Sequence, residues 1–276
     1  DPYTRVNHVH TTSRPVFQGF WEIPNYKQPI EHHTGRLWYF SEEEKRHLLL
    51  ATAAFTLALG LMVTGGIFGL LRNGISAWLI TIVVMMPVML FAVGPAFLLH
   101  EIGHKVVAKK YGCWAEFRAD PKGLKVGVAI AAVLGVVFMA PGAVMVAGLV
   151  TRRQNGHIAI AGPMVNFGLF LVGIPLGAVL IALTGANGDI TDILVGNSLN
   201  YKLLIWYMIK FWLTANLVLG MFNMLPFGPL DGLKVKAWSE VAFWAMLGVF
   251  VVPIVLWWFY GVWNPMDLVS SLASKI

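Results

Sequence analysis

Residues 77–108 read AWLITIVVMMPVMLFAVGPAFLLHEIGHKVVA. Positions 77–99 carry no charged side chain, whereas His100, Glu101 and His104 follow within one turn of the same stretch. About 20 apolar residues are enough for a helix to cross a hydrocarbon core of ~30 Å. We therefore predict a transmembrane helix with a polar cluster near its end.

The composition agrees with a membrane protein. Apolar residues make up 57% of the chain and charged residues 12%, where soluble domains carry about 25% charged residues. The net charge of +6 comes from sparse basic residues beside apolar runs, so nucleic acid is not an expected partner. Cys113 is the one cysteine, which excludes an intramolecular disulfide and a thiolate zinc cage.

Apolar stretches of membrane-spanning length recur along the chain. They predict an all-α polytopic membrane protein with about five to six transmembrane helices. A sixth stretch, 126–149, is ambiguous because Gly135 and Pro141-Gly142 interrupt it. Residues 1–46 are polar and are predicted to form an extramembrane segment, and 47–276 form the membrane domain. The five clear stretches are 47–70, 77–108, 157–183, 200–225 and 238–263.

The placement of charge favours a re-entrant path for 126–149. Basic residues cluster at 105–125, at Arg152-Arg153 and at Lys234 and Lys236, whereas 184–199 holds only acidic charges. If 126–149 enters and leaves the membrane on one side, every basic cluster falls on that side, as the positive-inside rule requires. A full crossing would place the later basic clusters outside. We predict a re-entrant segment and a cytoplasmic N-terminus.

The pentapeptide His100-Glu101-Ile102-Gly103-His104 is typical of zinc metalloproteases. On a helix, residues four positions apart share one face, so both imidazoles can bind one metal ion. Glu101 then lies beside the open coordination position as a general base. Histidine and glutamate are costly in a membrane without a partner, which favours a metal site over buried polar residues.

A third ligand is predicted at Asp231. Catalytic zinc usually takes three protein ligands and a water. The stretch Asn223-Met-Leu-Pro-Phe-Gly-Pro-Leu-Asp231-Gly232 breaks the fourth long apolar run, and its aspartate lies at the same depth as His104. A capping aspartate in a turn is the alternative for Asp231 taken alone.

These motifs resemble the site-2 protease family of intramembrane metalloproteases, in the family's order over about 98–232. The resemblance rests on the HEIGH pentapeptide, on Lys110-Tyr111-Gly112, on Gly162-Pro163-x-x-Asn166 and on the Leu-Pro-x-x-Pro-Leu-Asp-Gly stretch at 225–232. It implies zinc ligands at His100, His104 and Asp231 and a catalytic Glu101. It further implies that Asn166 lines the site, contacting substrate or the oxyanion, and that 118–149 forms a membrane-embedded β-hairpin.

The expected function is therefore hydrolysis of peptide bonds in or near transmembrane segments, with Zn²⁺ as cofactor and the active site toward the cytoplasmic side. Transmembrane protein substrates and the lipid bilayer are the expected partners, and a homo-oligomer is compatible with the sequence. Two alternatives stay open. One is a zinc-binding scaffold or carrier without proteolysis. The other is a protease whose third ligand is a later glutamate, Glu116 or Glu240, although both have surface character.

Overall fold

The computed structural model describes residues 36, 38–139, 141–189, 192–195 and 198–276. The chain divides into two units, Asp1–Glu31 and His32–Ile276, and every described residue belongs to the second. Most of the predicted polar segment 1–46 therefore lies outside the described residues.

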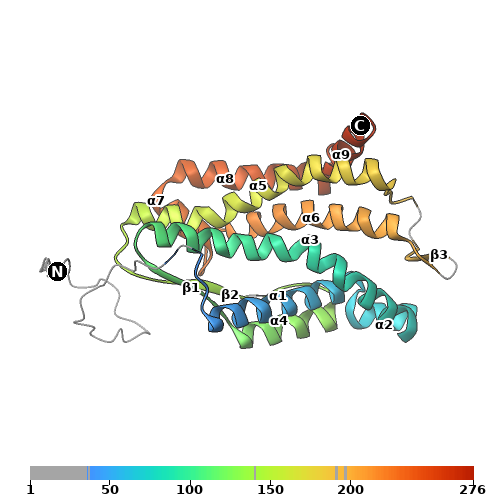
Figure 1. The fold of residues 1–276 in the computed structure, drawn as a ribbon, viewed down its shortest axis with the longest axis horizontal. Coiled ribbons are helices and arrows are strands. Elements are labelled where there is room, and N and C mark those ends of the chain that lie inside the picture. Colours follow the sequence, from blue (N-terminus) through green and yellow to red (C-terminus); the bar gives the residue numbers. More distant parts are fainter. Residues whose placement is uncertain (1–35, 37, 140, 190–191, 196–197) are drawn as a thin grey trace, which may run out of the picture. The chain divides into compact units, whose positions relative to one another are not determined.

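The second unit consists mainly of helices, with two short antiparallel strand pairs, β1–β2 and β3–β4 (Figure 1). The helices are α1 (Glu42–Val63), α2 (Gly66–Asn73), α3 (Ile75–Lys110), α4 (Pro121–Leu134), α5 (Arg152–Thr184), α6 (Tyr201–Asn223), α7 (Asp231–Trp238), α8 (Glu240–Trp258) and α9 (Pro265–Ala273). The strands are β1 (Trp114–Ala119), β2 (Gly142–Ala147), β3 (Leu194–Val195) and β4 (Ser198–Leu199).

Five of the described helices, α1, α3, α5, α6 and α8, are long and apolar enough to cross a membrane. They correspond to the five predicted stretches, and the largest difference is in the first. That span was predicted over 47–70, but α1 ends at Val63 because Gly65 and Gly66 adopt φ values of 75° and 56°. Such positive φ values suit glycine and break the helix. The chain continues as the separate short helix α2.

The helix ends follow from local sequence. Ser41 begins α1, where its hydroxyl accepts the Glu44 N–H at 3.2 Å and three acidic residues occupy the first turn. Thr151 and Gln154 form a capping box at the start of α5. Gly185, with φ 63°, ends the same helix.

The region 113–148 differs from the expected β-hairpin. Its two strands pair antiparallel, from Trp114 opposite Ala147 to Ala119 opposite Gly142, so the segment enters and leaves at the same end. Between the strands, however, lies the 14-residue helix α4. Asp120 caps this helix and Pro121 starts it, a combination that favours helix initiation. At 1.5 Å per residue α4 is roughly 21 Å long, too short to cross the membrane alone. The re-entrant path through a bilayer stays a prediction.

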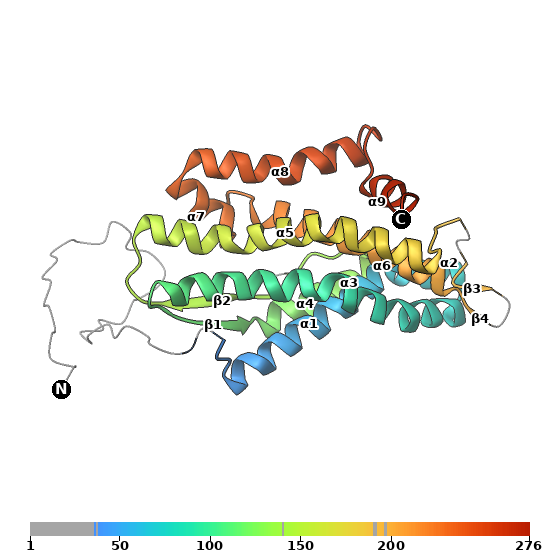
Figure 2. The same cartoon turned by 45° about the horizontal axis from the view of Figure 1, so that its top comes forward.

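The long helices α3, α5 and α6 pack against one another, with α1 and α4 on one side and α8 on the other (Figures 1 and 2). Because α5 runs opposite to α3, the first half of α5 lies beside the second half of α3. The start of α1 is fixed to α3 by a buried ion pair between Glu44 and Lys105. This packing brings residues far apart in sequence to one end of the helix bundle.

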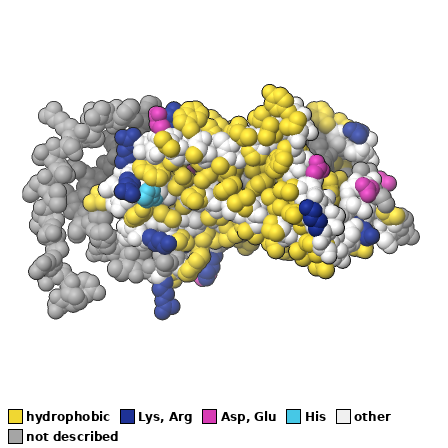
Figure 3. All heavy atoms as spheres, turned by 90° about the horizontal axis from the view of Figure 1, so that it is seen from above, with side chains coloured by type: hydrophobic (Ala, Val, Ile, Leu, Met, Phe, Trp, Pro, Cys, Tyr) yellow, Lys and Arg dark blue, Asp and Glu magenta, His cyan; other side chains and the backbone are white. Residues whose placement is uncertain are grey.

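Charge is distributed unevenly along the long helices. On the face shown in Figure 3, hydrophobic side chains cover the middle, lysine and arginine predominate toward one end, and acidic groups join basic ones at the other. The C-terminal end of α3 and the N-terminal end of α5 lie together at the basic end of the molecule, and they carry Lys109-Lys110 and Arg152-Arg153. Basic residues gathered at one end of the long helices are what the positive-inside rule predicts for a membrane protein.

Candidate metal centre

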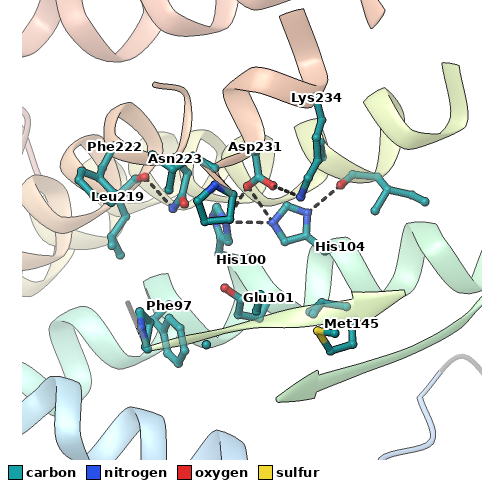
Figure 4. A pocket seen from close by; sticks show the side chains of 18 of the residues that line it. Phe97, His100, Glu101, His104, Met145, Leu219, Phe222, Asn223, Asp231 and Lys234 are labelled. Atoms are coloured by element: carbon teal, nitrogen blue, oxygen red, sulfur yellow. Dashed lines mark hydrogen bonds and ion pairs between the residues drawn. The ribbon is translucent and has the colours of Figure 1, made fainter. Parts of the chain in front are cut away.

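Two elements bring the predicted zinc ligands together. His100, Glu101 and His104 lie on the last third of α3, and Asp231 is the first residue of α7 (Figure 4). His100, His104 and Asp231 are buried, and each offers a ligand atom within 4.8 Å of the other two. The structure therefore assembles one cluster from residues as far apart in the sequence as His100 and Asp231.

The spacing of the three ligand atoms fits a tetrahedral metal ion. Nε2 of His100 and Nε2 of His104 are 3.0 Å apart. Asp231 Oδ2 lies 3.4 Å from the first and 3.1 Å from the second. Zn–N and Zn–O bonds of about 2.0–2.1 Å at tetrahedral angles separate ligand atoms by about 3.3 Å. The triangle matches the face of such a polyhedron.

The other ring nitrogens define how the two imidazoles face the centre. His100 Nδ1 lies 2.6 Å from Asn166 Oδ1, and His104 Nδ1 lies 2.7 Å from the carbonyl oxygen of Ile158. Since both partners are acceptors, each Nδ1 carries the proton and each Nε2 presents a lone pair. Two lone pairs at 3.0 Å repel each other unless a cation lies between them. The two Nε2 atoms therefore suit a metal ion. The hydrogen bonds at Nδ1 are of the kind that orients metal-binding histidines in proteins.

Asn166 is part of a buried network behind His100. Its Nδ2 donates to the carbonyl of Ala96 and to Asn216 Oδ1, both at 3.0 Å, which leaves Oδ1 for His100. Asn216 in turn donates to the Trp212 carbonyl at 2.9 Å. Both asparagines are fully buried. The contact of Asn166 with substrate stays a prediction, and the amide would have to release one of these bonds to make it.

Small residues let α3 and α5 approach closely at the centre. A Cβ added to Gly162 would lie 2.4 Å from His104 Nε2 and 2.5 Å from His100 Nε2. A Cβ added to Gly103 would lie 3.1 Å from the carbonyl oxygen of Ala161 in the neighbouring α5, which is a tight contact. The glycine at 162 thus leaves open the space that a metal ion would fill.

The short helix α7 is held against the start of α5, which places Asp231. Arg152 donates through Nε to the Ala237 carbonyl. The Trp238 side chain packs on Gly156, where an added Cβ would lie 2.3 Å from it, and meets His157 edge to face at 4.6 Å. Oδ2 of Asp231 faces both Nε2 atoms, so its carboxylate offers the third oxygen or nitrogen ligand to a cation.

Glu101 lies in a cavity of about 370 Å³ beside the histidines. Among the described residues, none forms a hydrogen bond or ion pair with its carboxylate. In the view of Figure 4 the side chain lies between the histidine rings and β2, on the side opposite Asp231. Strand β2 lines the cavity from Gly142 to Val146, and apolar side chains of α1, α3 and α6 complete it: Phe55, Phe97, Leu219 and Phe222.

Asn223 and Lys234 are polar cavity residues that the sequence did not predict at the site. Asn223 lines the cavity and donates to the Leu219 carbonyl at 3.0 Å. Lys234 also lines it, with Nζ 3.7 Å from Asp231 Oδ1, the oxygen that faces away from the histidines. Lys234 follows Asp231 by one helical turn, a spacing from which its proximity could have been inferred.

Comparison with known proteins identifies a similar curated protein. A curated protein of Methanocaldococcus jannaschii, named "Putative zinc metalloprotease", is 40% identical over 169 residues, which cover 61% of this chain and 78% of the relative. No family model and no solved structure matches the chain. The relative's name and the His-His-Asp cluster both agree with zinc as the cofactor.

Proposed function

We propose that this chain, which belongs to the family of the Methanocaldococcus jannaschii protein, is an intramembrane zinc endopeptidase of the site-2 protease type that cleaves transmembrane segments of other proteins. One observation carries the proposal. His100, Glu101 and His104 lie on α3, a helix apolar enough to cross a membrane, and Asp231 at the start of α7 completes a tetrahedrally spaced His-His-Asp triangle beside the glutamate.

His100 and His104 through Nε2, and Asp231 through Oδ2, would hold the metal. Bound zinc supplies a Lewis acid that polarises a carbonyl and lowers the pKa of water to about 7. Asn166 and the Ile158 carbonyl keep each Nδ1 protonated, so the ligand nitrogens stay available.

Glu101 is proposed as the proton carrier. Its carboxylate is free of partners among the described residues and faces the same cavity as the histidines. A carboxylate in this position takes a proton from the attacking water and returns it to the nitrogen of the leaving peptide. The neighbouring Phe97 and Leu219 restrict bulk water and so strengthen these electrostatic interactions.

The strand pair favours binding of an extended substrate at β2. The outer edge of β1 is occupied by α1, because Phe117 N–H donates to Glu44 Oε1 at 3.0 Å and Ala119 N–H donates to His47 Nδ1 at 3.3 Å. The other edge of the pair, β2, borders the cavity. An unwound substrate segment can add to this edge through main-chain hydrogen bonds and so present its peptide bond near Glu101.

The depth of the centre supports access of water from the basic end. His104 lies six residues before Lys110, roughly 9 Å along α3 at 1.5 Å per residue. The positive-inside rule then favours a cytoplasmic active site. Regulated proteolysis of membrane proteins is the corresponding biological role.

The decisive experiment compares the wild type with Glu101→Gln on a reporter that contains a transmembrane helix. Both proteins should bind about one zinc ion, and only the wild type should cleave the reporter. A scaffold or metal carrier would bind zinc without cleavage in either protein. Cleavage by Glu101→Gln at the wild-type rate would exclude Glu101 as the proton carrier.

A further inference from the structure

A second cavity lies between α1 and α4, away from the metal centre. This α1/α4 groove has a volume of about 370 Å³, within the roughly 300–1,000 Å³ typical of ligand pockets. Its walls are apolar except for one lysine. They include Leu50, Ala54, Leu124, Lys125, Val128 and Ala132.

Lys125 lines the groove near the start of α4, and Lys122 lies three residues before it on the same helix. Lys122 and Lys125 lie in the first turns of α4 and are exposed. Neither forms an ion pair with a carboxylate within the part of the chain that the structure describes. A cation near the start of a helix is also unfavourable to the helix dipole. Both lysines are therefore available to an anion from outside the protein.

The groove runs in the direction that a membrane lipid takes, from the membrane surface toward the interior. The start of α4 lies beside the first two turns of α1, because Ala119, next to the Asp120 cap, donates to His47. The end of α4 reaches Gly65, beyond the other end of α1, where a Cβ on Gly135 would lie 2.8 Å from the Gly65 carbonyl carbon. The groove thus runs from the basic end of the helices toward their middle. A headgroup at the lysines would leave its acyl chain along the apolar walls.

We propose that the α1/α4 groove binds an anionic phospholipid, with Lys122 and Lys125 at the phosphate and an acyl chain between Leu50, Ala54 and Val128. Each lysine near a membrane surface favours an anionic lipid about fivefold, so two lysines predict a preference of roughly 30-fold over a neutral lipid at low salt. The proposal is independent of the proteolytic activity.

The test uses purified, delipidated protein in detergent. Phosphatidylglycerol and phosphatidylcholine with identical acyl chains are titrated, and bound lipid is counted by native mass spectrometry. The wild type should prefer phosphatidylglycerol, and Lys122→Gln combined with Lys125→Gln should remove the preference. The matched control, Lys110→Gln combined with Arg153→Gln, removes the same charge from exposed residues outside the groove and should keep it.

Two further measurements separate a lipid site from other anion sites. Ala129→Leu adds bulk to the groove wall and should weaken binding of both lipids. Inorganic phosphate should not displace phosphatidylglycerol. Equal binding of the two lipids by the wild type, the same loss in the control as in the lysine variant, or displacement by phosphate would each overturn the proposal. An unchanged zinc content in every variant shows that the membrane domain is intact.

Discussion

Gly162→Ala should weaken zinc binding strongly through a single added methyl group. The new Cβ would lie 2.4 Å from His104 Nε2 and 2.5 Å from His100 Nε2. A non-bonded contact between such atoms needs about 3.5 Å, so the rings would have to retreat by about 1 Å. Metal sites tolerate deviations of about 0.2 Å. The required shift is roughly five times larger.

The rings have little freedom to make this shift, because Asn166 and the Ile158 carbonyl hold both Nδ1 atoms. Loss of an outer hydrogen bond alone costs about 10–100-fold in metal affinity. A direct clash with two ligand atoms should cost at least about 100-fold, equivalent to about 2.8 kcal/mol.

Zinc affinity is measured by competition with a chromophoric chelator, and thermal unfolding is followed in parallel. Gly168→Ala is the matched control, since it lies on the same helix and its added Cβ has no atom within 4 Å. That control should bind zinc normally and gain up to about 1 kcal/mol from helix propensity. If folded Gly162→Ala binds zinc as the wild type does, the two Nε2 atoms do not form the metal site.

Three further predictions concern the centre and its surroundings. Asp231→Ala should lower zinc affinity by about 100-fold or more, whereas Asp189→Ala, in the loop after α5, should leave it unchanged; equal affinities would remove Asp231 from the centre. Asn166→Ala should lower zinc affinity by about 10–100-fold, because His100 Nδ1 loses its acceptor, and an unchanged affinity would contradict the positioning role. In a Cys113→Ser background, Lys110→Cys and Arg153→Cys should react alike with an impermeant thiol reagent in sealed cells, and Asp189→Cys oppositely; opposite labelling of the first two would mean that 113–148 crosses the membrane.

The sequence predicted that His100, His104 and Asp231 lie close together because its signals are local. His100 and His104 are one helical turn apart, and the prolines and glycines before Asp231 mark a break in an apolar run. The geometry agrees with these inferences, as all three side chains meet. Residue spacing could also have indicated the supporting face of α5. Ile158, Gly162 and Asn166 repeat every four residues and therefore lie on one helix face, which is the face that contacts the two histidines.

Other features depended on contacts between distant residues. Strand β1 pairs with β2 across the intervening α4, and periodicity within either strand does not specify that partner. The helix in this region carried a recognisable start signal, Asp120 followed by Pro121. The β-hairpin that the family resemblance implies at 118–149 contains no such helix. The network from Asn166 to Asn216 likewise joins two helices, α5 and α6, so the sequence of either helix alone does not specify it.

The three candidate ligands are held in place by different contacts. His100 and His104 lie on a long helix that packs along α5, and α5 also supplies the groups that orient both rings. Asp231 comes instead from an eight-residue helix between a turn-rich segment and Ser239, and contacts near Trp238 fix that helix to the start of α5. The place of Asp231 therefore depends on the packing of α7 against α5 and α8, whereas the histidines are held by groups along α5. In Figure 4 the β2 edge borders the cavity on the side of Glu101, whereas Asp231 lies on the opposite side of the histidines. A substrate that enters along β2 therefore does not have to displace α7 or its candidate metal ligand.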